Sequence, residues 1–96
     1  METLRRLPWT EEGRAAYVPL GDGIVNHLAD VMEAEILGTA KADVSRARAL
    51  VGDSAASRTE LCRAVQYLAC AVEDAALVAD LRAERLASVR APGRPV

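Results

Sequence analysis

One run of residues constrains this chain more than any other: the stretch from Ser57 to Arg90 contains neither proline nor glycine. At its start, Ser57 and Glu60 have the spacing of a capping box, in which each side chain binds a backbone amide that the first helical turn leaves unpaired. Apolar residues then recur at helical spacing, with Arg82 out of line: Leu61, Val65, Leu68, Val72, Ala75, Ala79 and Leu86. This periodicity predicts one amphipathic helix about 48 Å long, with a single apolar stripe.

The composition restricts what can surround this helix. The chain has 96 residues, 51% of them apolar, but only 3% are aromatic and none is phenylalanine. A chain of this length forms one domain, and its core must be built from small side chains that let helices approach closely. These features favour two or three packed helices and argue against a β-sandwich.

Residues 1–19 differ in character from the rest of the chain. Glu11–Gly13 has the residues of a turn, and it lies between Trp9 and Tyr17, each of which is followed by a residue that favours strands. We therefore predict a small N-terminal β-hairpin or arm, with a short helix over 10–16 as the alternative. Because an isolated hairpin is marginally stable in water, we expect Trp9 and Tyr17 to lie against the helices and cap the core.

Two shorter helices are predicted between this arm and the long helix. Asp22 can cap the first, which runs to about Leu37 and stops at Gly38. Thr39 can cap the second, which runs to about Val51. The predicted fold class is therefore all-α, a three-helix bundle with a long C-terminal helix. Its parts are the N-terminal arm or hairpin (1–19), a helical core (20–90) and a disordered tail (91–96).

The long helix carries more apolar surface than two short helices can cover. Beside the main stripe, Leu77, Val78 and Leu81 widen the apolar arc, and an arc of that width is normally buried. We therefore predict that the C-terminal half of this helix contacts another molecule, either a second copy in a homodimer or a different protein partner. The predicted interface residues are Leu77, Val78, Leu81, Arg85 and Leu86.

The charge balance and the apolar runs argue against other partners. The formal net charge is -2 and the isoelectric point is near 5.3, which disfavours a general nucleic-acid-binding surface. The apolar runs are too short to span a bilayer, and no secretory signal follows Met1. We therefore expect a soluble cytoplasmic protein with reduced thiols.

The residues that could support chemistry do not combine into a site. His27 is the only histidine, and Asp30 follows one turn later, but no nucleophile or further metal ligand stands at helical spacing. Cys62 and Cys70 are about 12 Å apart along one predicted helix, so they cannot pair with each other. We interpret both as small apolar residues. The sequence predicts no catalytic residue, no metal, no cofactor and no small-molecule ligand.

Several short motifs occur in a characteristic order along residues 7–86. They are Leu7-Pro8-Trp9-Thr10 with Glu12-Gly13 and Tyr17-Val18, then Gly21-Asp22-Gly23, Leu28-Ala29-Asp30 and Glu33-Ala34, and finally Glu60-Leu61, Asp74-Ala75, Val78-Ala79 and Arg85-Leu86. This pattern resembles a group of small uncharacterised actinobacterial helical proteins, often encoded near helix-turn-helix regulators. The resemblance implies an accessory or regulatory role without enzymatic activity. Many members of the group have Pro-Cys before the tyrosine where this chain has Ala15-Ala16, so a thiol role does not carry over.

These observations predict a non-catalytic helical module for protein interaction or regulation. The alternative is a DNA-associated transcriptional regulator, although basic residues at a helix C-terminus also complement the helix dipole. Its candidate contacts are Arg46, Arg48, Arg58 and the C-terminal arginines. The third possibility is a small accessory enzyme of natural-product biosynthesis, which requires His27, Tyr67 and Cys70 to meet in one pocket.

Overall fold

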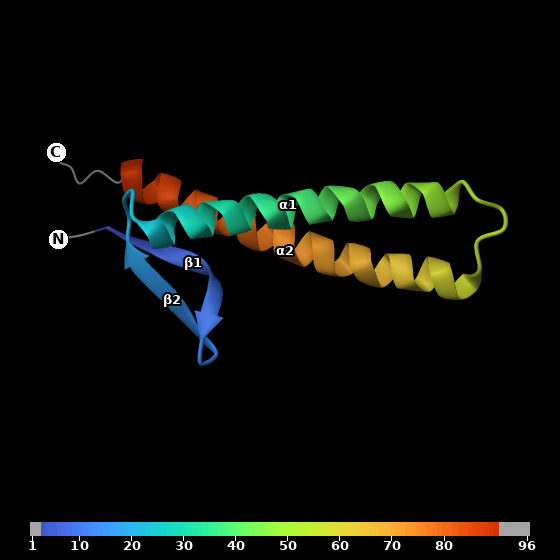
Figure 1. Ribbon diagram of the computed structural model, residues 1–96, viewed down its shortest axis with the longest axis horizontal. Coiled ribbons are helices and arrows are strands. Elements are labelled where there is room, and N and C mark those ends of the chain that lie inside the picture. Colours follow the sequence, from blue (N-terminus) through green and yellow to red (C-terminus); the bar gives the residue numbers. More distant parts are fainter. Residues whose placement is uncertain (1–2, 91–96) are drawn as a thin grey trace.

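The computed structural model describes residues 3–90, which form a β-hairpin followed by a pair of long helices. The elements are β1 (Leu4–Glu11), β2 (Arg14–Pro19), α1 (Ile24–Val51) and α2 (Arg58–Arg90). The two helices lie side by side in opposite directions, and the hairpin lies at the end where α1 begins and α2 finishes (Figure 1). The molecule is elongated, with extents of 61 × 31 × 21 Å. The predicted disordered tail, residues 91–96, lies outside the described residues.

The prediction of a three-helix bundle is wrong, because residues 24–51 form one helix and not two. α1 continues through Gly38 and Thr39, where the sequence suggests a stop and a new cap. A glycine inside a helix costs only about 1 kcal/mol relative to alanine, and packing of α1 along α2 offsets that cost. Asp22 does not cap α1 either, since Gly23 is the N-cap residue and no side chain hydrogen-bonds there.

The break between the helices is the loop that follows Gly52. The Gly52 amide donates to the carbonyl oxygen of Arg48 at 3.2 Å and closes the last turn of α1. At the start of α2, the Ser57 amide donates to Glu60 Oε1 at 2.9 Å, and the Glu60 amide donates to Ser57 Oγ at 3.1 Å. The predicted capping box is therefore confirmed, and α2 spans the stretch that the sequence assigns to it.

The N-terminal hairpin is present, and its turn explains why. Glu12 and Gly13 join the strands with φ angles of 51° and 76°, in the left-handed region that tight two-residue hairpin turns use. The pairing register shifts between Arg6 and Thr10, so β1 carries extra residues around Pro8. A proline cannot donate to the strand ladder, and a bulge is one of the few places where a strand tolerates it.

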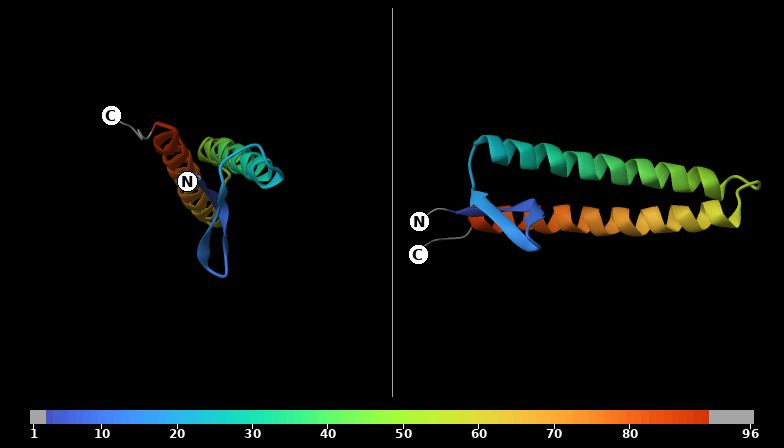
Figure 2. Two further views of the ribbon diagram at one scale, coloured as in Figure 1. Left: turned by 90° about the vertical axis from the view of Figure 1, so that its left-hand side faces the viewer. Right: turned by 60° about the horizontal axis from the view of Figure 1, so that its bottom comes forward.

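The hairpin covers one side of the helix pair near the end where α1 begins and α2 finishes (Figure 2). Leu7 of β1, Ala16 of β2 and Ala29 of α1 form a buried cluster, and Trp9 packs against it. Tyr17 is 54% exposed, because neighbouring residues of a strand point to opposite faces of the sheet. Tyr17 therefore does not cap the core, contrary to the prediction from the sequence.

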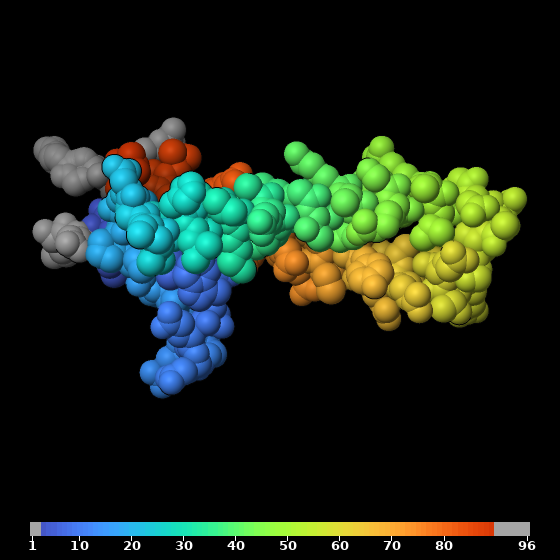
Figure 3. Space-filling model, viewed as in Figure 1, coloured from blue at the N-terminus to red at the C-terminus, as the bar shows by residue number. Residues whose placement is uncertain are grey.

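The helices meet along a narrow stripe of small and medium side chains. The inward positions recur at helical spacing: Ala29, Ile36, Ala40, Ala47 and Leu50 on α1, and Ala64, Leu68, Ala71, Ala75 and Val78 on α2. Alanine at these positions lets the two backbones approach closely. Beyond the hairpin, the rest of the length consists of the helix pair alone (Figure 3). A pair of helices has no third layer there, so larger side chains beside the stripe stay in contact with solvent.

Candidate interaction surface

The hairpin already covers much of the surface that the sequence assigns to a partner. Val78 and Leu81 are each 1% exposed within this single chain, and Leu77 is half-buried. β1 lies against this part of α2, where the guanidinium of Arg6 donates to Glu84 at 3.0 and 2.6 Å. Val78 and Leu81 therefore need no second molecule to hide them, which corrects the reason for predicting an interface at these two positions.

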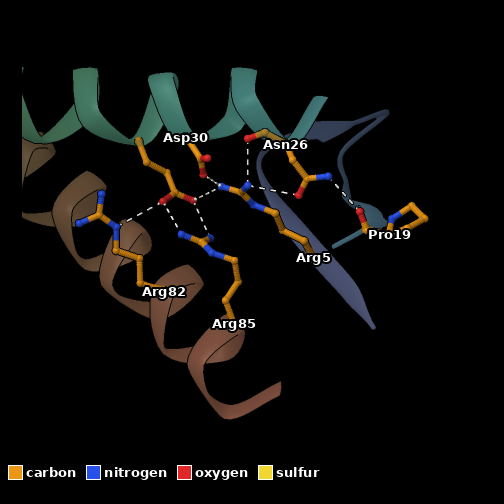
Figure 4. A network of polar contacts seen from close by, with 7 residues as sticks. Arg5, Pro19, Asn26, Asp30, Arg82 and Arg85 are labelled. Atoms are coloured by element: carbon orange, nitrogen blue, oxygen red, sulfur yellow. Dashed lines mark hydrogen bonds and ion pairs between the residues drawn. The ribbon is translucent and has the colours of Figure 1, made fainter. Parts of the chain in front are cut away.

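A buried charge network lies at the same end of the molecule (Figure 4), and Glu33, drawn there without a label between Arg82, Arg85 and Arg5, is its centre. Its carboxylate is 1% exposed and accepts hydrogen bonds from three arginines. Oε1 accepts from Arg85 at 2.8 Å and from Arg82 at 3.3 Å, and Oε2 accepts from Arg85 at 2.8 Å and from Arg5 at 3.3 Å. Arg85 thus forms a two-pronged pair with the carboxylate, the strong geometry for this pair of groups. Arg85, predicted as an interface residue, instead hydrogen-bonds to Glu33 of α1.

Arg5 extends the network into the hairpin. Its buried guanidinium donates to the backbone oxygen of Asn26 at 2.9 Å and to Asp30 Oδ1 at 2.7 Å. The Asn26 side chain donates in turn to the backbone oxygen of Pro19 at 2.9 Å. One set of polar contacts therefore joins both strands of the hairpin to both helices (Figure 4).

The network keeps Glu33 ionised. Burial by itself raises the pKa of Glu33, but hydrogen bonds and charges from Arg85, Arg5 and Arg82 bring this pKa below its ordinary value of 4.5. The same contact with Glu33 raises the pKa of Arg85. A carboxylate whose oxygens are occupied by guanidinium groups is a poor proton acceptor, so Glu33 serves as a structural anion and not as a general base.

The sequence contains a signal for this network. Arg82 interrupts the apolar stripe of α2, and Glu33 stands one heptad before the inward-facing Ala40 of α1. Buried charges are tolerated only when they are paired, so a carboxylate at an inward position of one helix and an arginine that interrupts the apolar stripe of the other indicate an ion pair. The pairing itself depends on the register between the helices, which the sequence does not provide.

The same contacts weaken the DNA-binding alternative. Arg82 and Arg85 bind Glu33, and Arg46 pairs with Asp43 one turn away on α1. These arginines are committed to carboxylates within the chain, and a phosphate backbone would have to compete for them.

The side of the helix pair away from the hairpin carries large apolar residues that face solvent. Val65 and Val72 of α2 are 65% and 67% exposed, and Leu86 is also exposed. These residues belong to the apolar stripe that the sequence reveals, yet α2 contacts α1 through the neighbouring stripe that contains Ala71. Only part of the predicted stripe, at positions such as Leu68, takes part in the helix contact. The remainder has no cover among residues 3–90.

Grooves between the helices make this surface continuous. Two of them, with volumes of about 370 and 250 Å³, share Val44 and Leu68 as lining residues. The charged residues that line them are Lys41 and Arg48, both from α1. We define the apolar face as the two grooves with the exposed valines beside them: Leu37, Val44, Val51, Val65, Leu68 and Val72.

The grooves on the opposite side of the helix pair have a mixed apolar and acidic lining, which includes Glu35, Asp43 and Asp74. Tyr67 and Cys70 line one groove there, but His27 does not line it. Cys62 and Cys70 are both exposed, which corrects their interpretation as packed apolar residues. The thiols are therefore accessible to reagents.

Two further features concern metal binding and membrane insertion. Residues 3–90 contain no group of three or more histidine, cysteine, aspartate or glutamate side chains placed to hold a metal ion. Neither helix there combines the length and the hydropathy that a membrane span requires.

Comparison with protein-family models, with curated proteins and with solved structures gave no significant match. The resemblance to small actinobacterial proteins therefore stays a prediction.

Proposed function

We propose that this protein is a non-catalytic interaction module that docks a protein partner on the apolar face. The observation that carries the proposal is the exposure of Val65 and Val72 beside a continuous groove. Contiguous apolar surface of this kind, bordered by polar residues, is typical of protein-interaction sites. Each of these valines contributes about 1.5 kcal/mol when a partner removes it from water.

The distribution of charge supports the same function. The most buried charged residues, Arg5 and Glu33, are engaged in holding the hairpin against the helices. The hairpin covers one side of the helix pair near the end where α1 begins, and it leaves the other side open along its length. We interpret the hairpin and its network as a brace that keeps the two helices in register while the apolar face stays available.

A charge placed on the apolar face tests the proposal. Tagged wild-type protein and Val72→Glu are used to capture partners from the native host, and the captured proteins are identified and rebound in purified form. We expect a partner that binds the wild type to bind Val72→Glu about a hundredfold or more weakly, because docking would bury an unpaired carboxylate.

Leu28→Glu is the matched control. Leu28 is an exposed aliphatic residue of α1, seven residues before Glu35, which lines the groove on the opposite side of the helix pair. Residues seven apart lie on the same face of a helix, so Leu28 lies on that opposite side too. The variant Leu28→Glu should therefore leave partner binding unchanged. Equal retention of every captured protein by the wild type and by Val72→Glu would contradict the proposal.

A further inference from the structure

We infer that the occupant of the apolar face is a second copy of this chain, and that the two helix pairs form a four-helix bundle. This inference rests on the proposed function, because it names the partner for the same surface. In the bundle, the long axes of the two copies are parallel, and α1 of each copy packs on α2 of the other. The two-fold axis runs along the length of the molecule.

The area of the chain supports a second copy. The accessible surface is 7018 Å², whereas a compact monomer of 10.2 kDa exposes about 5,300 Å². Each partner in a stable protein interface contributes roughly 800 Å². The extra surface of this elongated chain therefore exceeds what one dimer interface needs. Its radius of gyration of 17.8 Å is likewise larger than the roughly 13 Å of a compact chain of this length.

The charges beside the apolar face complement those of a second copy. Lys41 and Arg48 line the grooves on the α1 side, so that border is basic. On α2, the residues four positions beyond Ala69 and Ala76 are Glu73 and Asp80, so the far border is acidic along this part of the helix. Nearer the loop, the same border carries Arg58. A two-fold axis along the molecule brings the basic border of one copy to the acidic border of the other.

The levels of these residues along the bundle agree with this pairing. Residues 37–44 of α1 and 68–75 of α2 line one groove, and Lys41 and Val72 each lie near the middle of these ranges, so the two lie at about the same level of the helix pair. Glu73 adjoins Val72, and Lys41 of one copy therefore meets Glu73 of the second copy. If the two-fold axis ran across the molecule, α1 would pack on its own copy, and Lys41 and Arg48 of both chains would face each other. That arrangement is disfavoured because like charges repel.

Small residues on α2 allow the close approach that helix packing requires. Ala69 and Ala76 lie between the exposed valines and the acidic border, and they follow the heptad spacing of a helix-packing surface. A helix of the second copy can therefore rest on α2 at the same short distance that the chain uses for its own helix pair.

Sedimentation equilibrium at micromolar concentration tests the dimer. We expect the wild type to sediment at twice the chain mass of 10.2 kDa, and Val72→Glu to return to the mass of one chain with unchanged helical circular dichroism. Leu28→Glu should stay dimeric. If Val72→Glu loses helicity, Val65→Glu provides the same test at the neighbouring turn. A wild type that sediments at 10.2 kDa throughout this range would overturn the inference.

The variant Lys41→Glu tests the arrangement. If Lys41 meets Glu73 of the second copy, Lys41→Glu should raise the dimer dissociation constant about two- to thirtyfold, since two equivalent pairs are lost. Adding Glu73→Lys in the same chain should restore the wild-type value. Tighter association of Lys41→Glu would show that α1 packs on α1, and would overturn the proposed axis.

The outcomes separate this inference from the proposed function. A monomeric wild type that binds another protein, with binding lost in Val72→Glu, overturns the second copy and leaves the docking function in place. A monomeric wild type with no Val72-dependent binding overturns both.

Discussion

The half of the helix pair under the hairpin and the half that ends in the loop use the same two helices in opposite ways. Under the hairpin, the buried positions include large and charged side chains such as Leu81 and Glu33. In the other half, the buried positions are Ala47 and Ala71, and larger residues such as Val72 face solvent.

The difference shows what a third layer contributes. Two helices in contact can bury small side chains along one stripe, but a large side chain beside that stripe stays accessible until another element covers it. In one half, the hairpin is that element. In the other half, the chain offers none among its described residues, and the apolar face stays in contact with solvent.

The largest expected effect comes from removing the anion at the centre of the covered half. Glu33→Ala leaves the buried guanidinium of Arg5 with fewer partners and Arg85 with none of its carboxylate contacts, and should lower the free energy of unfolding by about 3–5 kcal/mol. Urea unfolding followed by Trp9 fluorescence and by circular dichroism measures this loss. Arg46→Ala removes an exposed ion pair from the other half and should cost less than about 1 kcal/mol. Equal losses of unfolding free energy in Glu33→Ala and Arg46→Ala would contradict the contrast between the two halves.

Lowering the pH should weaken the contacts of Glu33 with its arginines without any mutation. Because the pKa of Glu33 is lower in the folded chain than its ordinary value of 4.5, its stabilising contribution is complete above that pH and is lost as the pH falls further. Glu84, whose pKa is lowered by its hydrogen bond with Arg6, acts in the same direction. The urea concentration at the midpoint of unfolding should therefore fall as the pH is lowered below about 4.5. In Glu33→Gln, this midpoint should fall less steeply with pH. Identical pH profiles for the two proteins would refute the role of Glu33.

A matched pair of valines on α2 compares the halves directly. Val78→Ala opens a cavity under the hairpin and should cost about 2 kcal/mol. Val72→Ala changes a side chain that is 67% exposed, and should stay within about 0.5 kcal/mol. Both are measured by urea unfolding at a concentration low enough to keep the chain monomeric. Equal losses would mean that α2 presents a different stripe to α1.

A substitution inside α1 should give a small gain in stability. Gly38 lies inside α1, and a methyl group added there meets nothing within 4 Å. Gly38→Ala should therefore stabilise the helix by up to about 1 kcal/mol and raise the melting temperature by about 4–8 °C. Thermal unfolding measures this shift. A lower melting temperature would favour a chain that turns at Gly38, as in the predicted three-helix bundle.

The sequence predicts those elements whose ends depend on neighbouring residues. The capping box at Ser57 and Glu60 marks the start of α2, and the turn at Glu12 and Gly13 joins the two strands. Both are local, because the groups that hydrogen-bond or bend lie within a few residues of each other. Gly38 misleads for the converse reason: its weak local preference is outweighed by contacts with a distant helix.

The candidate surface is less predictable. The apolar stripe of α2 is visible in the sequence, but two adjacent stripes compete to face α1, and the alanine-rich one at Ala64, Ala71 and Val78 does so. The exposed valines are therefore recognisable as an unusual surface only once the helix pair is assembled.

What the sequence by itself determines is the start of α2 and the turn of the hairpin, together with the amount of apolar surface that α2 carries. The tertiary structure alone decides which stripe of α2 is covered, that Glu33 meets Arg5, Arg82 and Arg85, and that the hairpin shields only one side. The physical reason is that caps and turns act over a few residues, whereas burial depends on surfaces that lie far apart in the chain and meet only in the folded protein.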